Sequence, residues 1–543
     1  MSRRLFSPPI LVALAAIAAF LPSLGNGFVN LDDGWYLLTN PHFKGWTLEN
    51  IKWMFTPWPR GGHYAPLTWM SFGLDWSLWG MRPMGYHLTS NLLHAGGAVA
   101  FYFVGLRLFE DARTPKPDAA AFLAALLFAV HPLRVESVAW ASERRDVLSG
   151  LLYLLTIHFY LRRRLAASLA CYAASLLSKS MGMTLPFALI LLDFYPLARL
   201  PASPRGWVRP PERAVWLEKL PFLALAAAIA AVTVKLQVAS GAAWPVEKLS
   251  AVWRVGVACY GLMFYLAKTA LPLGLVPLYP MPSRIEDMAP VLALSILGGV
   301  CATALCALRA KRSPALLTVW AFYAVSLAPV SGLAQIGPQI AADRYSYIPC
   351  LGWALLLGWG VSRLPRNGAW AAGGLWILLL AGLTWRQTGI WRDSETLWTA
   401  TAASYPRHAP SRLFLGNIMD GQGRADEARG YYLEALSLEP GYGAAHNNLA
   451  NLLVRLDRGE EALGHYEAAL RASPGHQAVH YNWGVALLRL GRRGEAAEHF
   501  RQELGLAPDH EPSLRGLEAA LRDTRGRTSS QEKENRGKRG FPR

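Results

Sequence analysis

Two adjacent carboxylates, Asp32 and Asp33, stand in "FVNLDDGWYLLTNP" (residues 28–41), directly after an apolar run. Neighbouring carboxylates repel each other, and this repulsion raises the pKa of at least one of them. A carboxyl group with a raised pKa is better suited to take up a proton near neutral pH. The pair gains nothing from an adjacent bilayer surface. We therefore expect it to belong to a functional site rather than to an ordinary loop.

Later polar segments carry further ionisable residues beside apolar runs. The candidates are His63 and His87 in the first loop, His131, Glu136, Arg144 and Arg145 in "HPLRVESVAWASERRDVLS", Lys179 in "SKSMG", Lys268 in the run at 251–272, and Arg344 in "DRYSYIP". Ionisable residues at membrane depth are costly and are functional candidates by default. Each one alone has a structural explanation, as a solvated loop charge or an ion pair. The set as a whole favours a site, because it falls on one predicted face of the membrane.

Motifs of several other enzyme classes are absent from the sequence. It contains no HExxH, no P-loop, no GxGxxG after a predicted strand and no DxD, with which soluble nucleotide-sugar transferases commonly hold a metal. The five cysteines lie in or beside apolar segments and form no CxxC, so we interpret them as small buried thiols. These patterns predict no metal site and no firm cofactor.

The composition indicates that these residues are positioned by a membrane protein. The 543 residues are 52% hydrophobic and only 17% charged, with a mean hydropathy of +0.19, whereas soluble domains carry about 25% charged residues. The net charge of +17 is concentrated in short basic clusters between apolar runs. This distribution follows the positive-inside rule and argues against binding of nucleic acid.

Twelve apolar runs are long enough, or nearly so, to cross a bilayer. They lie at about 7–24, 88–109, 119–131, 146–161, 165–178, 180–198, 217–238, 251–272, 290–309, 315–331, 345–363 and 367–385. The basic stretches 199–213 and 309–312 lie on the same side of the membrane only if the chain crosses it an even number of times between them. Three of the runs lie between these stretches, so one of the three does not cross. The run at 251–272, which contains Arg254 and Lys268, is therefore predicted to be a re-entrant or interfacial helix. About eleven spans result, with the N-terminus inside and the polar loops and the C-terminal region outside.

A second region begins at residue 409, where three units repeat with a period of 34 residues. Pro440, Pro474 and Pro508 are equivalent, as are several small and aromatic positions. This pattern is typical of tetratricopeptide (TPR) repeats. We predict an all-α chain with a membrane domain at 1–398, a TPR α-solenoid at 409–522 (repeats 409–442, 443–476 and 477–510 and a capping helix), and a disordered basic tail at 523–543. The asparagines on the first helices of the repeats are expected to bind an acceptor peptide: Asn417, Asn447, Asn448, Asn451 and Asn482.

Several segments together resemble the TMTC family of TPR-containing protein O-mannosyltransferases, within the GT-C superfamily of membrane glycosyltransferases. They are "DDGWYLLTNP", "YAPLTWMS", "GYHLTSNLLH", "HPLRVESVAWASERRDVLS", "SKSMGMTLPFALILLDFYPL" and "DRYSYIPCLG". The resemblance covers nearly the whole chain, and the HPxxxE block is its most specific part. It implies a GT-C-like bundle that transfers mannose from a lipid phosphate to Ser or Thr hydroxyls of proteins.

The resemblance also implies roles for the candidate residues. Asp32 or Asp33 would be the general base, and which of the two takes the proton stays open. Arg144, Arg145, Lys179, Lys268 and Arg344 would bind the donor phosphate, while His63, His87, His131 and Glu136 would orient the substrates. A single displacement would invert the anomeric carbon. A divalent metal held by His63, Asp33 and Glu136 stays an alternative.

The Ala/Leu/Arg-rich composition favours a bacterial inner-membrane protein, and hence a polyprenyl-phosphate sugar as donor and periplasmic proteins as acceptors. Two alternatives remain at this stage. The same fold could glycosylate a lipid or a cell-wall glycan, or the chain could be a non-catalytic membrane-anchored TPR scaffold. The clustering of acids and bases argues against the scaffold.

Overall fold

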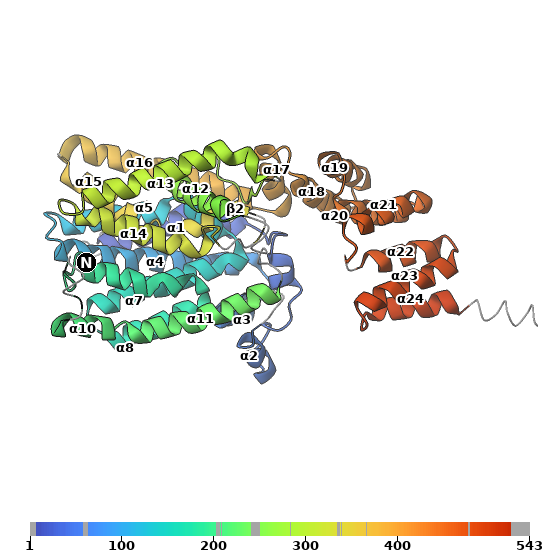
Figure 1. Ribbon diagram of the computed structural model, residues 1–543, viewed down its shortest axis with the longest axis horizontal. Helices are drawn as coiled ribbons and strands as arrows, with labels where there is room; N and C mark the ends of the chain where they lie inside the picture. Colours follow the sequence, from blue (N-terminus) through green and yellow to red (C-terminus); the bar gives the residue numbers. More distant parts are fainter. Residues whose placement is uncertain are drawn as a thin grey trace, which may run out of the picture. The chain divides into compact units, whose positions relative to one another are not determined.

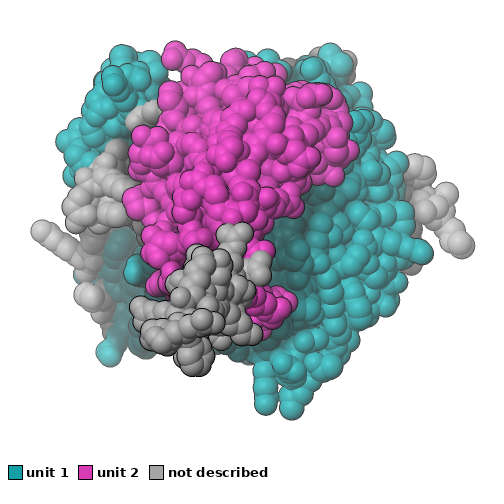
Figure 2. Space-filling view, turned by 90° about the vertical axis from the view of Figure 1, so that its right-hand side faces the viewer, with its two compact units in different colours: residues 1–397 teal, residues 398–543 magenta. Residues whose placement is uncertain are grey.

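The computed structural model describes residues 7–57, 63–201, 207, 209–240, 250–282, 284–333, 337, 339–364, 366–475 and 478–522. The predicted basic tail at 523–543 lies outside these residues. The chain divides into two compact units, residues 1–397 and residues 398–543, which Figure 2 distinguishes by colour. We describe each unit separately.

The first unit is a bundle of helices of very different lengths (Figure 1). Its first half contains α1 (Pro8–Phe20), α2 (Leu48–Met54), α3 (Pro66–Trp79), α4 (Pro83–Asp111), α5 (Pro117–Val130), α6 (Val135–Ala139), α7 (Arg144–Leu161), α8 (Leu165–Ser178) and α9 (Leu185–Phe194). Its second half contains α10 (Pro210–Leu217), α11 (Leu220–Ala239), α12 (Ala251–Ala270), α13 (Ala289–Leu308), α14 (Pro314–Leu327), α15 (Leu351–Arg363) and α16 (Arg366–Thr388). Helix α17 (Ser394–Ser404) contains the boundary between the units.

Four helices in the described part of the chain are long and apolar enough to cross a membrane. They span Pro8–Gly25, Pro83–Asp111, Glu212–Ala239 and Ile285–Leu308, and a fifth results if the bent pair Pro117–Val130 and Pro132–Ala139 counts as one span. The predicted count of eleven is not confirmed, because apolar helices such as α8 and α14 contain only 14 residues each. A helix of that length is about 21 Å long, shorter than the roughly 30 Å hydrocarbon core.

Small residues let the helices of the first unit pack closely. At Gly358 of α15, a Cβ atom would lie only 2.5 Å from the Ala120 carbonyl oxygen of α5. Glycine at such contacts allows two helix backbones to approach each other, as is common in membrane bundles. This contact between α5 and α15 helps to hold the segment that precedes α15 beside the segment that follows α5.

Short turns between the helices contain or flank several of the polar candidates, among them Asp33, Lys179 and Arg344. The relevant ones are η3 (Gly34–Leu38), a π-helical turn, and the 3₁₀ turns η5 (Pro132–Arg134), η6 (Ala141–Glu143), η7 (Ser180–Thr184) and η12 (Asp343–Ser346). Among the described residues the strands are β1 (Tyr279–Pro280) and β2 (Gln339–Ala341), which pair antiparallel. The pairing places the segment before α13 beside the start of η12.

The second unit consists of helix hairpins. They are formed by α18 (Ala409–Gly421) and α19 (Ala425–Leu438), α20 (Gly443–Arg455) and α21 (Gly459–Ala472), and α22 (Val479–Arg489) and α23 (Arg493–Leu506), followed by α24 (Glu511–Leu521). In the first hairpin Gly416 packs against the ring of Tyr432, where a Cβ atom would lie only 2.5 Å away. The small residue at this position of each repeat (Gly416, Ala450 and Gly484) and the aromatic residue it faces therefore fix how closely the two helices of a hairpin approach.

One departure from the repeat has a structural role. Glu503 stands where the earlier repeats have Ala435 and Ala469, and its side chain is buried. Its carboxylate accepts hydrogen bonds from the backbone N–H groups of Ala478 at 3.0 Å and Tyr481 at 3.4 Å. These donors are at the start of α22, where a negative charge satisfies free N–H groups and opposes the helix dipole.

Candidate active site at the start of helix α7

The sequence "SERRD" gathers four charged residues where a short turn becomes a helix. Glu143 ends η6, and Arg144, Arg145 and Asp146 form the first turn of α7. Successive residues on a helix point about 100° apart, so the two neighbouring arginines must face different surroundings. This geometry separates their roles.

Glu143 is the centre of a buried ion-pair cluster. Arg145 Nη2 lies 2.5 Å from one Glu143 oxygen, and the Lys179 ammonium binds the other. Lys179 also lies 2.7 Å from the Asp146 carboxylate, which accepts a 2.9 Å hydrogen bond from the Ser137 hydroxyl. The side chain of Glu143 is fully buried, while those of Arg145 and Lys179 are 6% and 12% exposed. Arg145 and Lys179 are thus slightly exposed to solvent, whereas the Glu143 carboxylate that they share is not.

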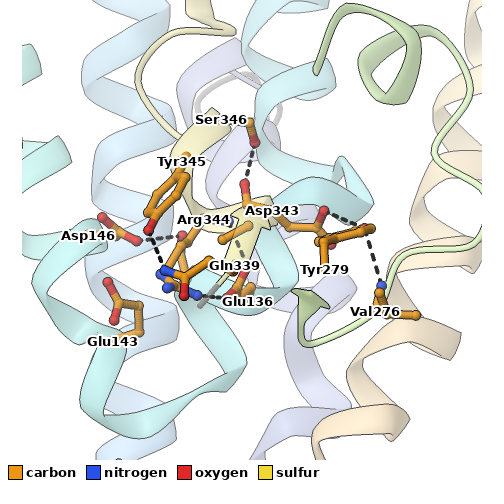
Figure 3. A network of polar contacts seen from close by, with 12 residues as sticks. Glu136, Glu143, Asp146, Val276, Tyr279, Gln339, Asp343, Arg344, Tyr345 and Ser346 are labelled. Carbon is orange, nitrogen blue, oxygen red and sulfur yellow. Dashed lines mark hydrogen bonds and ion pairs between the residues drawn. The ribbon is translucent and has the colours of Figure 1, made fainter. Parts of the chain in front are cut away.

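A third cation joins from a distant part of the sequence (Figure 3). The Arg344 guanidinium binds one Glu136 oxygen, and its backbone N–H donates to the other at 2.8 Å. Beside this pair, Tyr279 donates a 2.8 Å hydrogen bond to Asp343. Tyr279 and Asp343 come from the segments that β1 and β2 hold together. The pairing of β1 with β2 and the two hydrogen bonds from Arg344 to Glu136 therefore fix Arg344 next to the Glu143 cluster.

The two adjacent aspartates have different environments. Asp33 is 1% exposed, and its two carboxylate oxygens accept hydrogen bonds from the backbone N–H groups of Val29 at 2.9 Å and Ser142 at 3.0 Å. Asp33 therefore ties the first loop to η6. Asp32 is half-buried, and the charges of Arg145, Glu143 and Arg344 act on it. A π-helical turn follows directly, a feature that is frequent at functional sites.

The pKa values of the three acids reflect these surroundings. Burial raises the pKa of Asp33 to about 6, although two backbone N–H groups oppose the shift. Burial also raises the pKa of Asp32, against the opposing charge of Arg145. Burial alone would raise the pKa of Glu143, but Arg145, Lys179 and Arg344 outweigh it and hold that pKa well below its usual range. The three cations thus favour the ionised form of Glu143, and Asp32 is the more exposed of the two aspartates.

Not every predicted residue joins this cluster. His63 is exposed and lies within electrostatic range of Arg145 and Lys179. Arg144 is fully buried elsewhere: it binds the Asp75 carboxylate and donates to the Tyr86 carbonyl at 2.7 Å. Its separation from the predicted phosphate-binding set follows from its different direction on α7.

Three other predicted residues contact backbone instead. The His87 ring lies 3.4 Å from the Gly27 carbonyl oxygen, and the His131 ring lies 3.1 Å from that of Thr269. The Lys268 ammonium lies 2.5 Å from the Leu273 carbonyl oxygen. The two histidine contacts connect distant segments of the bundle, whereas the Lys268 contact is local and closes the end of α12.

The structure also brings in residues that the sequence did not single out. Glu143 binds two cations of the cluster, and its signal in the sequence was its place before two arginines in "SERRD". Trp140 lies under the Arg344 guanidinium, 5.5 Å from the ring centroid, and stacks on Trp391. The sequence showed that Trp140 lies close to "SERRD". It could not show its partners, because Arg344 and Trp391 are more than 200 positions away in the chain.

Within the described ranges, no group of three or more His, Cys, Asp or Glu side chains is arranged to hold a metal ion. The alternative of a metal held by His63, Asp33 and Glu136 therefore has no geometric support. Asp33 and Glu136 both use their oxygens on protein donors. The cations of the cluster are the groups available to an anionic ligand.

In the second unit, the predicted asparagines hydrogen-bond to each other in a ladder. Asn448 donates to Asn417 at 2.7 Å and accepts from Asn447 at 3.1 Å, and Asn482 donates to Asn447 at 3.1 Å. Asn451 accepts a 2.6 Å hydrogen bond from Tyr466. A hollow of about 340 Å³ is lined by Asn417, Asn448 and Asn451 together with Asp420, Tyr432 and Arg455.

Comparison with known proteins places this geometry in a family context. A tetratricopeptide repeat family model matches residues 379–443 and 447–511. Solved TPR structures match too, among them the first TPR domain of the human RPAP3 protein. That domain is 22% identical over 23% of this chain and 98% of that chain, with a TM-score of 0.22. The curated relatives include protein O-mannosyl-transferase TMTC1 of Homo sapiens, which is 26% identical over 81% of this chain and 56% of the relative.

Two further relatives extend this similarity. They are Tmtc3 of Drosophila melanogaster (24% identical; 71% of this chain, 49% of the relative) and F38B6.6 of Caenorhabditis elegans (27% identical; 80% and 63%), both named protein O-mannosyl-transferases. The chain spans about half the length of the curated relatives it matches. The predicted resemblance is confirmed: over about four-fifths of its length, this chain is similar to the TMTC protein O-mannosyl-transferases, and its C-terminal region contains TPR repeats.

Proposed function

We propose that the first unit is a membrane glycosyltransferase that moves a sugar from a polyprenyl-phosphate donor to Ser or Thr hydroxyls of exported proteins. The observation that carries this proposal is the meeting of three cations, Arg145, Lys179 and Arg344, beside the half-buried Asp32. The names of the relatives support a protein acceptor and mannose as the sugar. The cluster would lie on the outer face of a bacterial inner membrane, within a GT-C-like bundle of about eleven spans.

The donor phosphate would bind to the three cations. Arg145 uses Nη2 on Glu143, while its buried Nε has no hydrogen-bond partner in the part of the chain that the structure describes. Arg344 is 15% exposed and keeps further N–H donors beyond the one that binds Glu136. Guanidinium groups with free donors suit phosphate oxygens, because they form short charge-assisted hydrogen bonds. The acids beneath them fix their positions before the donor arrives, so little reorganisation is needed.

Asp32 is the proposed general base. The acceptor hydroxyl oxygen forms a bond to the anomeric carbon of the sugar, while the bond from that carbon to the phosphate oxygen breaks. The hydroxyl proton passes to Asp32, and the polyprenyl phosphate leaves with one more negative charge, which the three cations stabilise. One displacement inverts the anomeric carbon. Asp33 is less suited to this work, because both of its oxygens already accept backbone hydrogen bonds.

The TPR unit would bring the acceptor to this site. The asparagine ladder offers amide groups that can hydrogen-bond an extended backbone whatever its sequence. TPR arrays present such surfaces on extended concave faces. Recruitment by the repeats would let one transferase unit act on many different proteins.

The decisive experiment compares Asp32→Asn with Asp33→Asn in the purified full chain. Transfer from a polyprenyl-phosphate mannose to a Ser/Thr peptide is measured by mass spectrometry, and thermal unfolding is measured in the same detergent. We expect Asp32→Asn to lower kcat by about 10²–10⁴-fold without lowering Tm. Asp33→Asn should mainly lower Tm, because it weakens the acceptors for two buried N–H groups. Asp111→Asn, which changes an acid at the end of α4 that pairs with Arg107, is the matched control.

The assignment of the base is wrong if Asp32→Asn keeps full kcat or if Asp33→Asn alone abolishes transfer. The pH profile gives a second readout. Because the base must be ionised, kcat should fall as the pH drops through the pKa of Asp32, which burial raises above its ordinary value. The product's anomeric configuration, read by NMR, tests inversion separately.

A further inference from the structure

A second cavity lies in the first unit, away from the Glu143 cluster. It has a volume of about 650 Å³ and lies between α4, α7, α9, α14 and α15, of which α14 packs on both α9 and α15. Its wall is largely aliphatic and aromatic, with Phe101, Leu154 and Leu355 among the residues that line it. The size falls within the range of small-molecule sites. An apolar hollow of this size fits a hydrocarbon chain.

The arginine end of the cavity lies away from the Glu143 cluster. Helix α7 contributes Asp146 to the cluster from its first turn and Ile157 to the cavity from its last turns. Eleven residues of helix separate the two positions by about 17 Å. Helix α15 lines the cavity along its length, from Leu351 at its start to Arg363 at its end. None of the described residues of the Glu143 cluster lines the cavity, so its arginine end is a site separate from the proposed donor site.

Three arginines, Arg309, Arg312 and Arg363, line the cavity, and no Asp or Glu is among the described residues that line it. All three side chains are exposed, and none forms an ion pair with a carboxylate of the described residues. Helix α14 also begins at Pro314 in the cavity lining, so that its positive dipole end adds to the charge. The Ser313 and Thr318 hydroxyls lie in the same lining. Positive charge at the end of an apolar hollow matches an anionic head group on an aliphatic tail.

We propose that this cavity binds an anionic phospholipid, with the phosphate on the three arginines and an acyl chain along the apolar wall. Basic pockets between membrane helices bind anionic lipid head groups in this way. Free phosphate would leave the apolar wall uncovered, and a neutral lipid would leave the arginines unused. The described lining offers no carboxylate that could act as a base, so the cavity would hold its lipid without reacting. The proposal does not depend on the transfer reaction.

Lipid binding is tested by native mass spectrometry of the full chain in mild detergent. Phosphatidylglycerol is titrated in, with phosphatidylcholine, polyprenyl phosphate and inorganic phosphate as separate arms. The first variant is Arg309→Gln/Arg312→Gln/Arg363→Gln. Its matched control is Arg162→Gln/Arg163→Gln/Arg164→Gln, which removes the same charge from exposed loop arginines that do not line the cavity. A second variant, Gly360→Phe, fills the cavity without changing charge, since a Cβ at Gly360 meets open space.

We expect the Arg309/Arg312/Arg363 variant and Gly360→Phe each to weaken phosphatidylglycerol binding at least tenfold, with the loop control within twofold of the native chain. Phosphatidylcholine should bind weakly to all of them. The proposal is overturned if the loop control loses as much binding as the cavity variants, or if Gly360→Phe binds normally. Tighter binding of polyprenyl phosphate than of phosphatidylglycerol, or displacement of the lipid by inorganic phosphate, would also overturn it. Unchanged Tm of Gly360→Phe shows that the fold is kept.

Discussion

The two units use the same kind of ion pair in opposite ways. In the TPR unit, Arg–Glu pairs at i,i+3 recur with the repeat, at Arg424–Glu427, Arg458–Glu461 and Arg492–Glu495, and their side chains are 38–57% exposed. In the membrane unit, Glu143 is fully buried between Arg145 and Lys179. Exposed pairs contribute little to stability. Buried charges are costly to bring together and costly to separate, so their presence favours a functional reason.

The two units also differ in where their contacts come from. In the TPR unit, each hairpin packs on its neighbours, so the chain meets itself close in sequence. In the membrane unit, Arg344 binds Glu136 across 208 positions, and Asp33 binds Ser142 across 109. The first arrangement can be repeated or shortened, whereas the second exists only when the whole bundle has formed. The predictions below test this contrast.

The largest expected effect follows from removing the central acid of the buried cluster. Glu143→Gln leaves the buried charge of Arg145 without its paired carboxylate and leaves Lys179 with Asp146 alone, which should lower the free energy of unfolding by about 3–5 kcal/mol. Glu495→Gln removes an exposed acid from the same type of pair and should change the free energy of unfolding much less, because solvent screens the pair. Denaturant unfolding of the full chain in detergent measures both. Equal losses in the two variants would remove the contrast between the units.

A smaller effect is expected from glycine substitutions in the TPR unit. Gly416→Ala places a Cβ 2.5 Å from the Tyr432 ring and should cost about 1–3 kcal/mol by overpacking. Gly430→Ala, in the adjacent helix α19, meets nothing within 4 Å and should stabilise by about 0.4–1 kcal/mol. Hydrogen exchange of residues 409–438 in the full chain reports both changes. If the two variants shift the protection from exchange in the same direction, the packing of this hairpin does not depend on the absence of a side chain at Gly416.

The smallest effect concerns two histidine pairs that also follow the repeat. His446 and His465 lie 2.9 Å apart between their Nδ1 atoms, and His480 and His499 lie 3.0 Å apart. Burial lowers the pKa of His499 to about 4, with His480 adding to the shift, and burial also lowers the pKa values of His465 and His480. The folded repeats therefore bind fewer protons than the unfolded chain between about pH 6.5 and 4.

The sign of the pH dependence follows from this difference. The folded repeats are most stable above about pH 6.5, and their free energy of unfolding falls progressively as the pH drops from about 6.5 to 4. Hydrogen exchange of α21 and α23, corrected for the intrinsic effect of pH, should show weaker protection at pH 5 than at pH 7.5. His465→Asn/His499→Asn should flatten this dependence. A variant that keeps the full dependence would show that other groups cause it.

Residues that the sequence alone could identify fall into two groups. The TPR repeats were predictable in detail, because Gly416, Tyr432 and their equivalents act through contacts that recur every 34 residues. The charged residues around the candidate site were also visible, because acids and arginines are conspicuous between apolar runs. Their individual environments were not visible, since Arg144 and Arg145 are neighbours of the same type but face Asp75 and Glu143, respectively.

The sequence by itself thus determined a helical membrane chain with TPR repeats, the likeness to the TMTC family, and most of the residues that meet at the site. Only the tertiary structure decided that Asp33 ties the first loop to Ser142 while Asp32 stays accessible, and that Glu143 organises the cations. The reason is physical. Burial, partners and pKa depend on segments that are more than a hundred residues apart in the chain and adjacent only in the folded bundle.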